Sequence, residues 1–124
     1  MNECVFCNHP GLSVLETSLS YAVYDKYPVS EGHILVIPKR HEADYFRLTD
    51  HEKTDLWRLV DHVKDLLDER FHPDGYNIGI NINRSAGQTI FHVHIHVIPR
   101  YEGDLEDPAG GVRGVIPGKR KYDH

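Results

Sequence analysis

The sequence of 124 residues predicts a single α+β domain, in which an antiparallel sheet carries one long helix packed on a face. Three observations support this fold class. Four short apolar runs end at proline or turn residues, one long segment between the second and third runs has helical periodicity, and no internal repeat or linker interrupts the chain. Hydrophobic residues make up 40% of the chain, which is enough for a core in one domain of this length.

The first two predicted strands precede the helix. One runs from Tyr21 to about Asp25 and is ended by Pro28, and the next runs from His33 to Ile37 and is ended by Pro38. Because proline has no N–H for a strand ladder, each run is expected to leave the sheet at that point.

The helix has its clearest signal at the start. Thr49 and Glu52 form a capping box, in which each side chain binds the backbone N–H of the other residue. Apolar residues then recur at helical spacing: Leu56, Leu59, Val60, Val63, Leu66 and Leu67. The helix is therefore predicted from Asp50 to about Arg70, and the turn sequence HPDG at residues 72–75 ends it.

Two more strands and a tail are predicted after the helix. Residues 76–82 form the third strand, residues 83–88 a polar loop, and residues 89–100 a fourth strand that Pro99 stops. After Tyr101, glycine and proline break every period. About residues 102–124 are therefore expected to form an irregular tail that covers a surface of the single domain 1–124.

Composition and charge narrow the function classes. The formal charge of −5 gives no basic field, so neither nucleic acid nor a membrane is expected as a partner. No apolar run approaches the roughly 18 residues of a membrane span, and the N-terminal sequence resembles no secretory signal, so a cytoplasmic location is expected. Cys4 and Cys7 form one CxxC, which favours metal or redox chemistry over a structural disulfide in a reducing compartment.

Three histidines alternate with apolar residues in the predicted fourth strand. Successive side chains on a strand point to opposite faces, so His92, His94 and His96 share one face. The apolar residues on the other face are expected to pack under the helix: Phe91, Val93, Ile95 and Val97. The outer two imidazoles lie roughly 13 Å apart along a strand. Because zinc binds nitrogen at about 2 Å, a single metal held by all three is not expected.

Three interpretations of the histidine row remain open: an incidental pattern, a His-x-His metal pair, or a cleft that handles an anion. A mostly neutral imidazole is nucleophilic and easily protonated, so a row can offer both a nucleophile and a proton donor to a phosphate. The preceding loop favours the phosphate interpretation. Its small residues and glycine let backbone N–H groups approach an anion, and Gln88 and Thr89 add an amide and a hydroxyl.

These motifs together resemble the histidine triad (HIT) family. The sequence HVHIHVI fits the family signature of three histidines alternating with apolar residues, and the resemblance extends over about residues 4–101 through CVFC, YAVYDKYPVSEGHILVIPKRH, the helix and NIGININRSAGQ. The ending HVIPRYEGD resembles the fragile-histidine-triad branch, which cleaves dinucleoside polyphosphates, more than the nucleoside phosphoramidase branch. The resemblance implies a HIT-like antiparallel sheet and a homodimer formed by edge-to-edge pairing of sheets.

The resemblance implies covalent catalysis. His94 matches the nucleophile that attacks the α-phosphorus of a nucleotide, and water then releases a nucleoside monophosphate from the nucleotidyl-histidine. His96 matches the histidine that stabilises the charge of the reacting phosphate, and His33 matches a fourth, supporting histidine. A purely structural hydrogen bond is the alternative for His33.

The resemblance also implies nucleotide-binding residues. Asp25 matches a residue that binds the ribose hydroxyls, although it could instead be only a turn residue. Asn81 and Gln88 match residues that contact the phosphate and the leaving-group side, and Thr89 matches a residue lining the same pocket.

A structural zinc site is implied by the same resemblance. Zinc-bearing members hold the ion with two cysteines and two histidines, which match Cys4, Cys7, His41 and His92 here. Four protein ligands leave no open position, so this zinc would be structural. An unmetallated cysteine pair is the alternative, and Mg²⁺ accompanying the substrate is a second candidate metal.

The sequence therefore predicts a nucleotide hydrolase or transferase that cleaves dinucleoside polyphosphates at the α-phosphate. A nucleoside phosphoramidase is the alternative enzyme, and a non-catalytic module that binds nucleotide or zinc is the alternative outside catalysis. The complete histidine row together with Gln88 argues against the non-catalytic module, because binding alone does not need a nucleophile.

Overall fold

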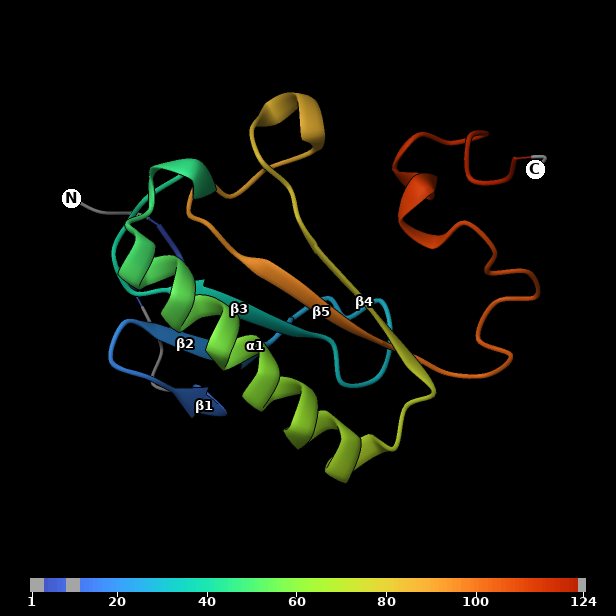
Figure 1. Ribbon diagram of the computed structural model, residues 1–124, viewed down its shortest axis with the longest axis horizontal. Helices are drawn as coiled ribbons and strands as arrows, with labels where there is room; N and C mark the ends of the chain where they lie inside the picture. The colour runs from blue at the N-terminus through green and yellow to red at the C-terminus, as the bar shows by residue number, and fades with distance from the viewer. Residues whose placement is uncertain (1–3, 9–11, 123–124) are drawn as a thin grey trace.

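A five-stranded antiparallel sheet and one long helix form the domain in the computed structural model, which describes residues 4–8 and 12–122. The strands lie in the order β1 (Leu15–Glu16), β2 (Ser20–Tyr24), β3 (Ile34–Pro38), β5 (Ile95–Arg100) and β4 (Gly75–Ile80). Helix α1 (Asp50–Phe71) lies across one face of this sheet (Figure 1). The predicted α+β class is confirmed.

The predicted capping box begins α1. The Thr49 hydroxyl accepts a hydrogen bond from the Glu52 N–H at 3.1 Å, and the Glu52 carboxylate accepts one from the Thr49 N–H at 2.8 Å. The helix ends one residue beyond the predicted Arg70. His72 then adopts the left-handed conformation at φ 52°, and its N–H donates to the Asp68 carbonyl, which closes the last turn.

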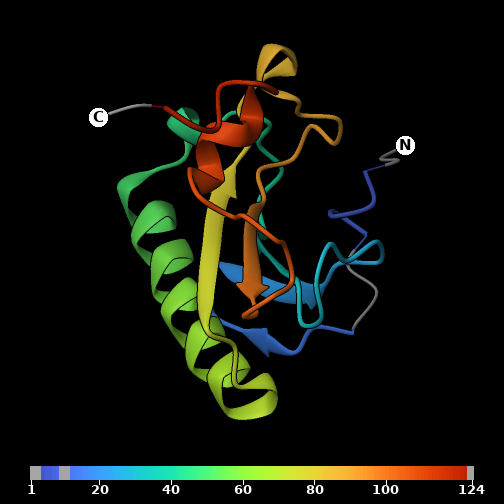
Figure 2. The same ribbon diagram turned by 90° about the vertical axis from the view of Figure 1, so that its right-hand side faces the viewer.

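The sheet buries apolar side chains on both faces. On the helix face, Ala22, Val36 and Ile95 pack against a row of α1 residues that share one side of the helix: Leu56, Leu59, Val60, Val63 and Leu67. On the opposite face, a smaller cluster of Tyr21, Leu35 and Ile37 packs against Phe6 and Val23. All five residues of β3 are buried, because both faces of this strand are covered. The helix covers one face, and the N-terminal segment that carries Phe6 covers the other (Figure 2).

The fourth strand was predicted to begin at Thr89, and this was wrong, because β5 begins at Ile95. Residues 88–94 instead bind the segment that follows β3: the Val93 N–H donates to the Glu42 carbonyl at 2.7 Å. As a result Phe91 is 39% exposed and does not pack under α1, whereas the three other predicted residues of that face do: Val93, Ile95 and Val97.

Other boundaries also differ from the sequence prediction. The third predicted strand ends at Ile80 and not at Ile82. The two-residue strand β1 and three short 3₁₀ helices were not predicted: η1 (Tyr45–Arg47), η2 (Arg84–Ala86) and η3 (Gly111–Val115). These pieces are too short to have a period that a sequence pattern reveals.

The chain after β5 lies beside β4, as both views show (Figures 1 and 2), and η3 contacts that strand. Charged groups within this segment bind one another: Lys121 pairs with Asp107, and the Arg120 guanidinium donates to the Asp107 and Ala109 carbonyls. That this C-terminal segment belongs to a single domain with the sheet and the helix stays a prediction. In the part of the chain that is described, no helix has the length and apolar character that a membrane crossing requires.

Candidate active site and metal centre

A row of imidazoles crosses the sheet face opposite α1. His96 pairs in register with Leu35, a residue of the smaller cluster, and so lies on that face, while Ile95 and Val97 face the helix. The ring centroid of His96 lies 5.2 Å from that of His33 and 5.1 Å from that of His94. The Asp25 carboxylate extends the row, with Oδ2 at 3.5 Å from His33 Nε2.

The hydrogen bond of His94 determines where its ring carries a proton. His94 is 9% exposed, and its Nδ1 lies 2.9 Å from the carbonyl oxygen of His92. A carbonyl oxygen can only accept, so Nδ1 carries the proton. In the neutral ring Nε2 then holds a lone pair, and this arrangement makes Nε2 the nucleophilic atom.

A second pair of hydrogen bonds determines the tautomers of His33 and His96. The Val29 N–H donates to His33 Nδ1 at 3.1 Å, so neutral His33 carries its proton on Nε2. This Nε2 lies 3.0 Å from His96 Nδ1, which therefore accepts, and the remaining proton of neutral His96 lies on its Nε2. His96 thus presents a hydrogen-bond donor beside the His94 ring.

Burial lowers the pKa of both His96 and His33. The pKa of His96 falls to about 4, chiefly through loss of hydration and with smaller contributions from the neighbouring His94 and His33, while the Asp25 carboxylate acts in the opposite direction. Burial also lowers the pKa of His33, again opposed by Asp25. At neutral pH His96 is therefore a neutral N–H donor and not a fixed cation.

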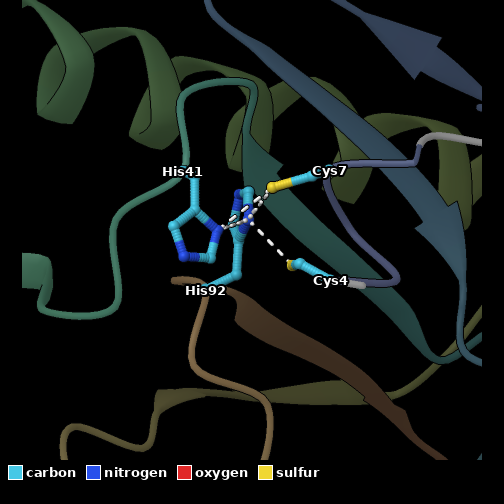
Figure 3. Close-up of side chains that lie close together, drawn as sticks. All are labelled: Cys4, Cys7, His41 and His92. Carbon is cyan, nitrogen blue, oxygen red and sulfur yellow. Dashed lines mark hydrogen bonds between the residues drawn. The ribbon is translucent and has the colours of Figure 1, made fainter. Parts of the chain in front are cut away.

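The structure brings together the four residues of the predicted metal site, as Figure 3 shows: Cys4, Cys7, His41 and His92. Their ligand atoms all lie within 4.8 Å of one another. His92 Nδ1 is 3.4 Å from each sulfur and 3.2 Å from His41 Nδ1, and Cys7 Sγ is 3.0 Å from His41 Nδ1. Ligands of a tetrahedral zinc ion are separated by about 3.5 Å, so these distances fit a closed zinc centre after a small expansion.

The tautomer of His92 also fits a metal. Its Nε2 lies 2.7 Å from the Pro38 carbonyl oxygen, so Nε2 carries the proton and the lone pair on Nδ1 faces the two sulfurs. Burial lowers the pKa of His92, which favours the neutral form that a metal needs. Cys4 and Cys7 are not linked to each other by a disulfide, so both sulfurs can serve as metal ligands. The segment after β3 that carries His41 is bound to α1 through the Arg40–Glu52 ion pair.

A second cluster has three potential ligand atoms within 4.8 Å, from Asp25, His33 and His96. Here the hydrogen bonds argue against a metal. Because His33 Nδ1 accepts the Val29 N–H, its Nε2 is protonated and has no lone pair for an ion. This cluster is therefore a hydrogen-bonded chain that supports His96.

Three other predicted residues, Asn81, Gln88 and Thr89, lie in the segment between β4 and β5. Gln88 is buried and its amide is bound to the backbone: Oε1 accepts the Asn83 N–H at 2.7 Å, and Nε2 donates to the Ala43 and Ile90 carbonyls. Asn81 is half-buried directly after β4, and Thr89 is exposed. The Asp25 carboxylate also stabilises a turn, because its Oδ1 accepts a hydrogen bond from the Tyr27 N–H at 2.9 Å.

Phe6 is a site residue that the sequence analysis missed. It lies between the two cysteines, and its ring centroid is 5.1 Å from His94 and 5.9 Å from His92. A lone aromatic residue in a short N-terminal segment has no period or motif that would predict its contact with His94.

Residues 8–103 match the family model described as the HIT domain. A protein named bis(5'-adenosyl)-triphosphatase from Dictyostelium discoideum is 43% identical over 91 residues, which cover 73% of this chain and 61% of that relative. A protein named adenosine 5'-monophosphoramidase from Schizosaccharomyces pombe is 39% identical over 103 residues, covering 79% of this chain and 74% of that relative. The crystal structure of a zinc-bound histidine triad family protein from Mycobacterium smegmatis matches with a TM-score of 0.77 at 33% identity, covering 85% of this chain and 80% of that one.

The depressed pKa of His96 predicts a pH-dependent stability. Between pH about 6.5 and about 4, the unfolded imidazole binds a proton more readily than the folded one, so the free energy of unfolding should fall as the pH is lowered through this window. His96→Asn cannot be protonated and should make this fall shallower. Urea unfolding between pH 7.5 and pH 4 with a chelator present measures the effect, with His51→Asn on the exposed start of α1 as control. An unchanged slope in His96→Asn would contradict the assignment.

Proposed function

The chain belongs to the HIT domain family, and from that premise we propose that it hydrolyses dinucleoside polyphosphates by attack of His94 on the α-phosphorus. This membership confirms the resemblance predicted from the sequence. One observation carries the proposal: the His92 carbonyl accepts the Nδ1 proton of His94, which leaves the Nε2 lone pair available as the nucleophile.

The reaction has two displacements. In the first, the Nε2 lone pair of His94 forms a bond to the α-phosphorus, and the bond from phosphorus to the bridging oxygen breaks, its electron pair leaving with the polyphosphate. The Nδ1 proton stays hydrogen-bonded to the His92 carbonyl, which stabilises the positive charge on the ring. In the second, the oxygen of water forms a bond to phosphorus and the phosphorus–nitrogen bond breaks, its electron pair returning to His94 Nε2. The nucleoside monophosphate leaves with the oxygen of water, and a proton is released to solvent.

His96 would act on the charge that develops on the phosphoryl oxygens. Its Nε2–H can donate to a non-bridging oxygen, and His33 holds its ring through the Nε2–Nδ1 hydrogen bond of 3.0 Å. A neutral donor suits this role, because it binds the developing charge without holding the anionic substrate as strongly as a cation would.

The nucleotide would lie along the row, with its ribose toward Asp25. The half-buried Asp25 carboxylate can accept hydrogen bonds from two vicinal hydroxyls. Asn81 and Thr89 are proposed to contact the phosphate and the leaving group. Gln88 is proposed to act there as well, by shaping the loop through its backbone contacts. Mg²⁺ bound to the polyphosphate would neutralise part of its charge.

A nucleoside phosphoramidase is the alternative, because the same nucleophile can attack an α-phosphorus whose leaving group is an amine. The 39% identity to a protein named adenosine 5'-monophosphoramidase supports it. The 43% identity to the protein named bis(5'-adenosyl)-triphosphatase favours the polyphosphate. A non-catalytic binding module is disfavoured, since binding does not require a nucleophile whose lone pair is kept free of hydrogen bonds to the backbone.

Zinc is proposed as a structural ion held by Cys4, Cys7, His41 and His92. When bound, it would cross-link the N-terminal segment to the segment that carries the nucleophile, and four protein ligands would leave it no position for substrate. A reducing compartment such as the cytoplasm would keep both cysteines as ligands. A homodimer is proposed through edge-to-edge pairing of sheets. β4 is an edge strand of the sheet, and η3 contacts it.

The proposed nucleophile is tested by His94→Ala. Alanine cannot form the covalent intermediate, so kcat/KM for diadenosine triphosphate should fall by at least about a thousandfold with the fold intact. His62→Ala, on the exposed side of α1, is the matched control and should behave as the parent. A panel of dinucleoside polyphosphates and nucleoside phosphoramidates, compared by kcat/KM, separates the two enzymatic proposals. Activity in His94→Ala within tenfold of the parent would exclude this nucleophile.

The proposed zinc site is tested by metal analysis. The purified protein should hold close to one zinc per chain, and Cys4→Ser or His41→Ala should each lower the zinc content and the melting temperature, because binding free energy contributes to folding. His51→Ala, a surface histidine outside the cluster, is the control and should change neither. Equal stability and no zinc in parent and variants alike would leave Cys4 and Cys7 as an unmetallated pair.

A further inference from the structure

The loop Cys4–Cys7 contacts the nucleophile as well as forming the metal cluster. We propose that Phe6 is a positioning residue that holds the His94 ring in its attacking orientation, so that metal binding at the two flanking cysteines is coupled to the position of His94. This inference rests on the proposed function, since the attack is the one assigned there.

Phe6 is held on several sides. Its side chain packs against the buried cluster of Tyr21, Leu35 and Ile37, and its carbonyl accepts the Tyr21 hydroxyl at 2.6 Å. From this position its ring lies 5.1 Å from the His94 ring at an interplanar angle of 62°, and 5.9 Å from the His92 ring at 89°. Both are edge-to-face contacts, which are favourable for aromatic rings at these distances.

The His94 ring needs such a neighbour. The hydrogen bond from Nδ1 to the His92 carbonyl fixes one ring atom and does not by itself fix the tilt of the ring about that atom. Attack in line with a phosphorus–oxygen bond tolerates little tilt, and misplacement by about 1 Å can cost a hundredfold in rate. Phe6 and His96, each with its centroid 5.1 Å from His94, restrict the tilt, and Phe6 has no polar atom that could occupy the Nε2 lone pair.

Metal binding is coupled to the position of the His94 ring by two routes. The first runs through Phe6, because Phe6 lies between Cys4 and Cys7 in the loop and both cysteines are ligand candidates. The second runs through His92, whose Nδ1 faces the metal cluster while its carbonyl accepts the His94 proton. A metal that fixes both sulfurs and His92 would therefore fix the ring contact and the hydrogen bond of the nucleophile together.

Phe6→Ala and Phe6→Leu test this proposal, with Val5→Ala as the matched control, since Val5 is 59% exposed in the same loop. Rapid-quench measurement of nucleotidyl-enzyme formation from diadenosine triphosphate should show the rate lowered at least about tenfold in Phe6→Ala. Zinc content and the Kd for the nucleoside monophosphate should stay close to the parent values. Phe6→Leu should recover part of the rate, and Val5→Ala should match the parent.

A second readout does not depend on activity. NMR signals of the His94 ring protons should shift when a chelator removes zinc from the parent. The shift should be smaller in Phe6→Ala, because that variant lacks the aromatic ring through which the loop contacts His94 and keeps only the route through His92. A parent that forms no nucleotidyl-enzyme would overturn the proposed function, while the NMR comparison would still test the coupling.

Three outcomes would overturn the inference. A raised Kd with an unchanged rate of nucleotidyl-enzyme formation would make Phe6 a nucleoside contact. Zinc loss in both Phe6→Ala and Phe6→Leu would make it a structural part of the metal loop. If Phe6→Ala loses zinc and Phe6→Leu keeps it, the Phe6→Leu variant decides. A parental rate of nucleotidyl-enzyme formation in zinc-loaded Phe6→Leu, together with His94 signals like those of the parent, would contradict positioning by the aromatic ring.

Discussion

Hydrogen bonds from the backbone determine which nitrogen of each imidazole carries a proton, and the chemistry of the site depends on them. The Pro38 carbonyl leaves the lone pair of His92 on Nδ1, facing the cysteines, and the His92 carbonyl leaves the lone pair of His94 on Nε2. The Val29 N–H, acting on His33, leaves His96 with a proton on Nε2. Under the proposed function, these three histidines thereby differ in role as a metal ligand, a nucleophile and a hydrogen-bond donor, although nothing in their residue type distinguishes them.

The fold supplies these backbone groups by interrupting regular structure beside the sheet. His92 and His94 precede β5, so the His92 carbonyl is outside the strand ladder and can accept the side chain two residues later. Val93 binds the Glu42 carbonyl in place of a neighbouring strand, which joins this segment to the one that carries His41. The helix packs on one face, and the predicted metal site and His94 meet on the opposite face, beside the N-terminal segment.

Sequence patterns predicted what depends on periodicity or on a motif. The helix with its Thr49 cap, the fold class and the shared face of the histidines follow from local spacing, and the zinc ligand set came from the family resemblance. The start of β5 at Ile95 was missed because it depends on a contact with Glu42, about fifty residues away. Phe6 was missed for a similar reason. Its role depends on packing against His94, and no local pattern in CVFC contains that contact.

The central claim is that His94 attacks through Nε2, and the most direct measurement is the site of the covalent bond. The protein is mixed rapidly with diadenosine triphosphate, quenched in alkaline denaturant, and digested for mass spectrometry of the peptide around His94. ³¹P-coupled ¹H–¹⁵N NMR of the trapped protein then identifies the bonded nitrogen. We expect one nucleoside monophosphoryl group on Nε2 of His94. A group on Nδ1, on His96 or on His33, or turnover with no covalent species at any time, would contradict the account.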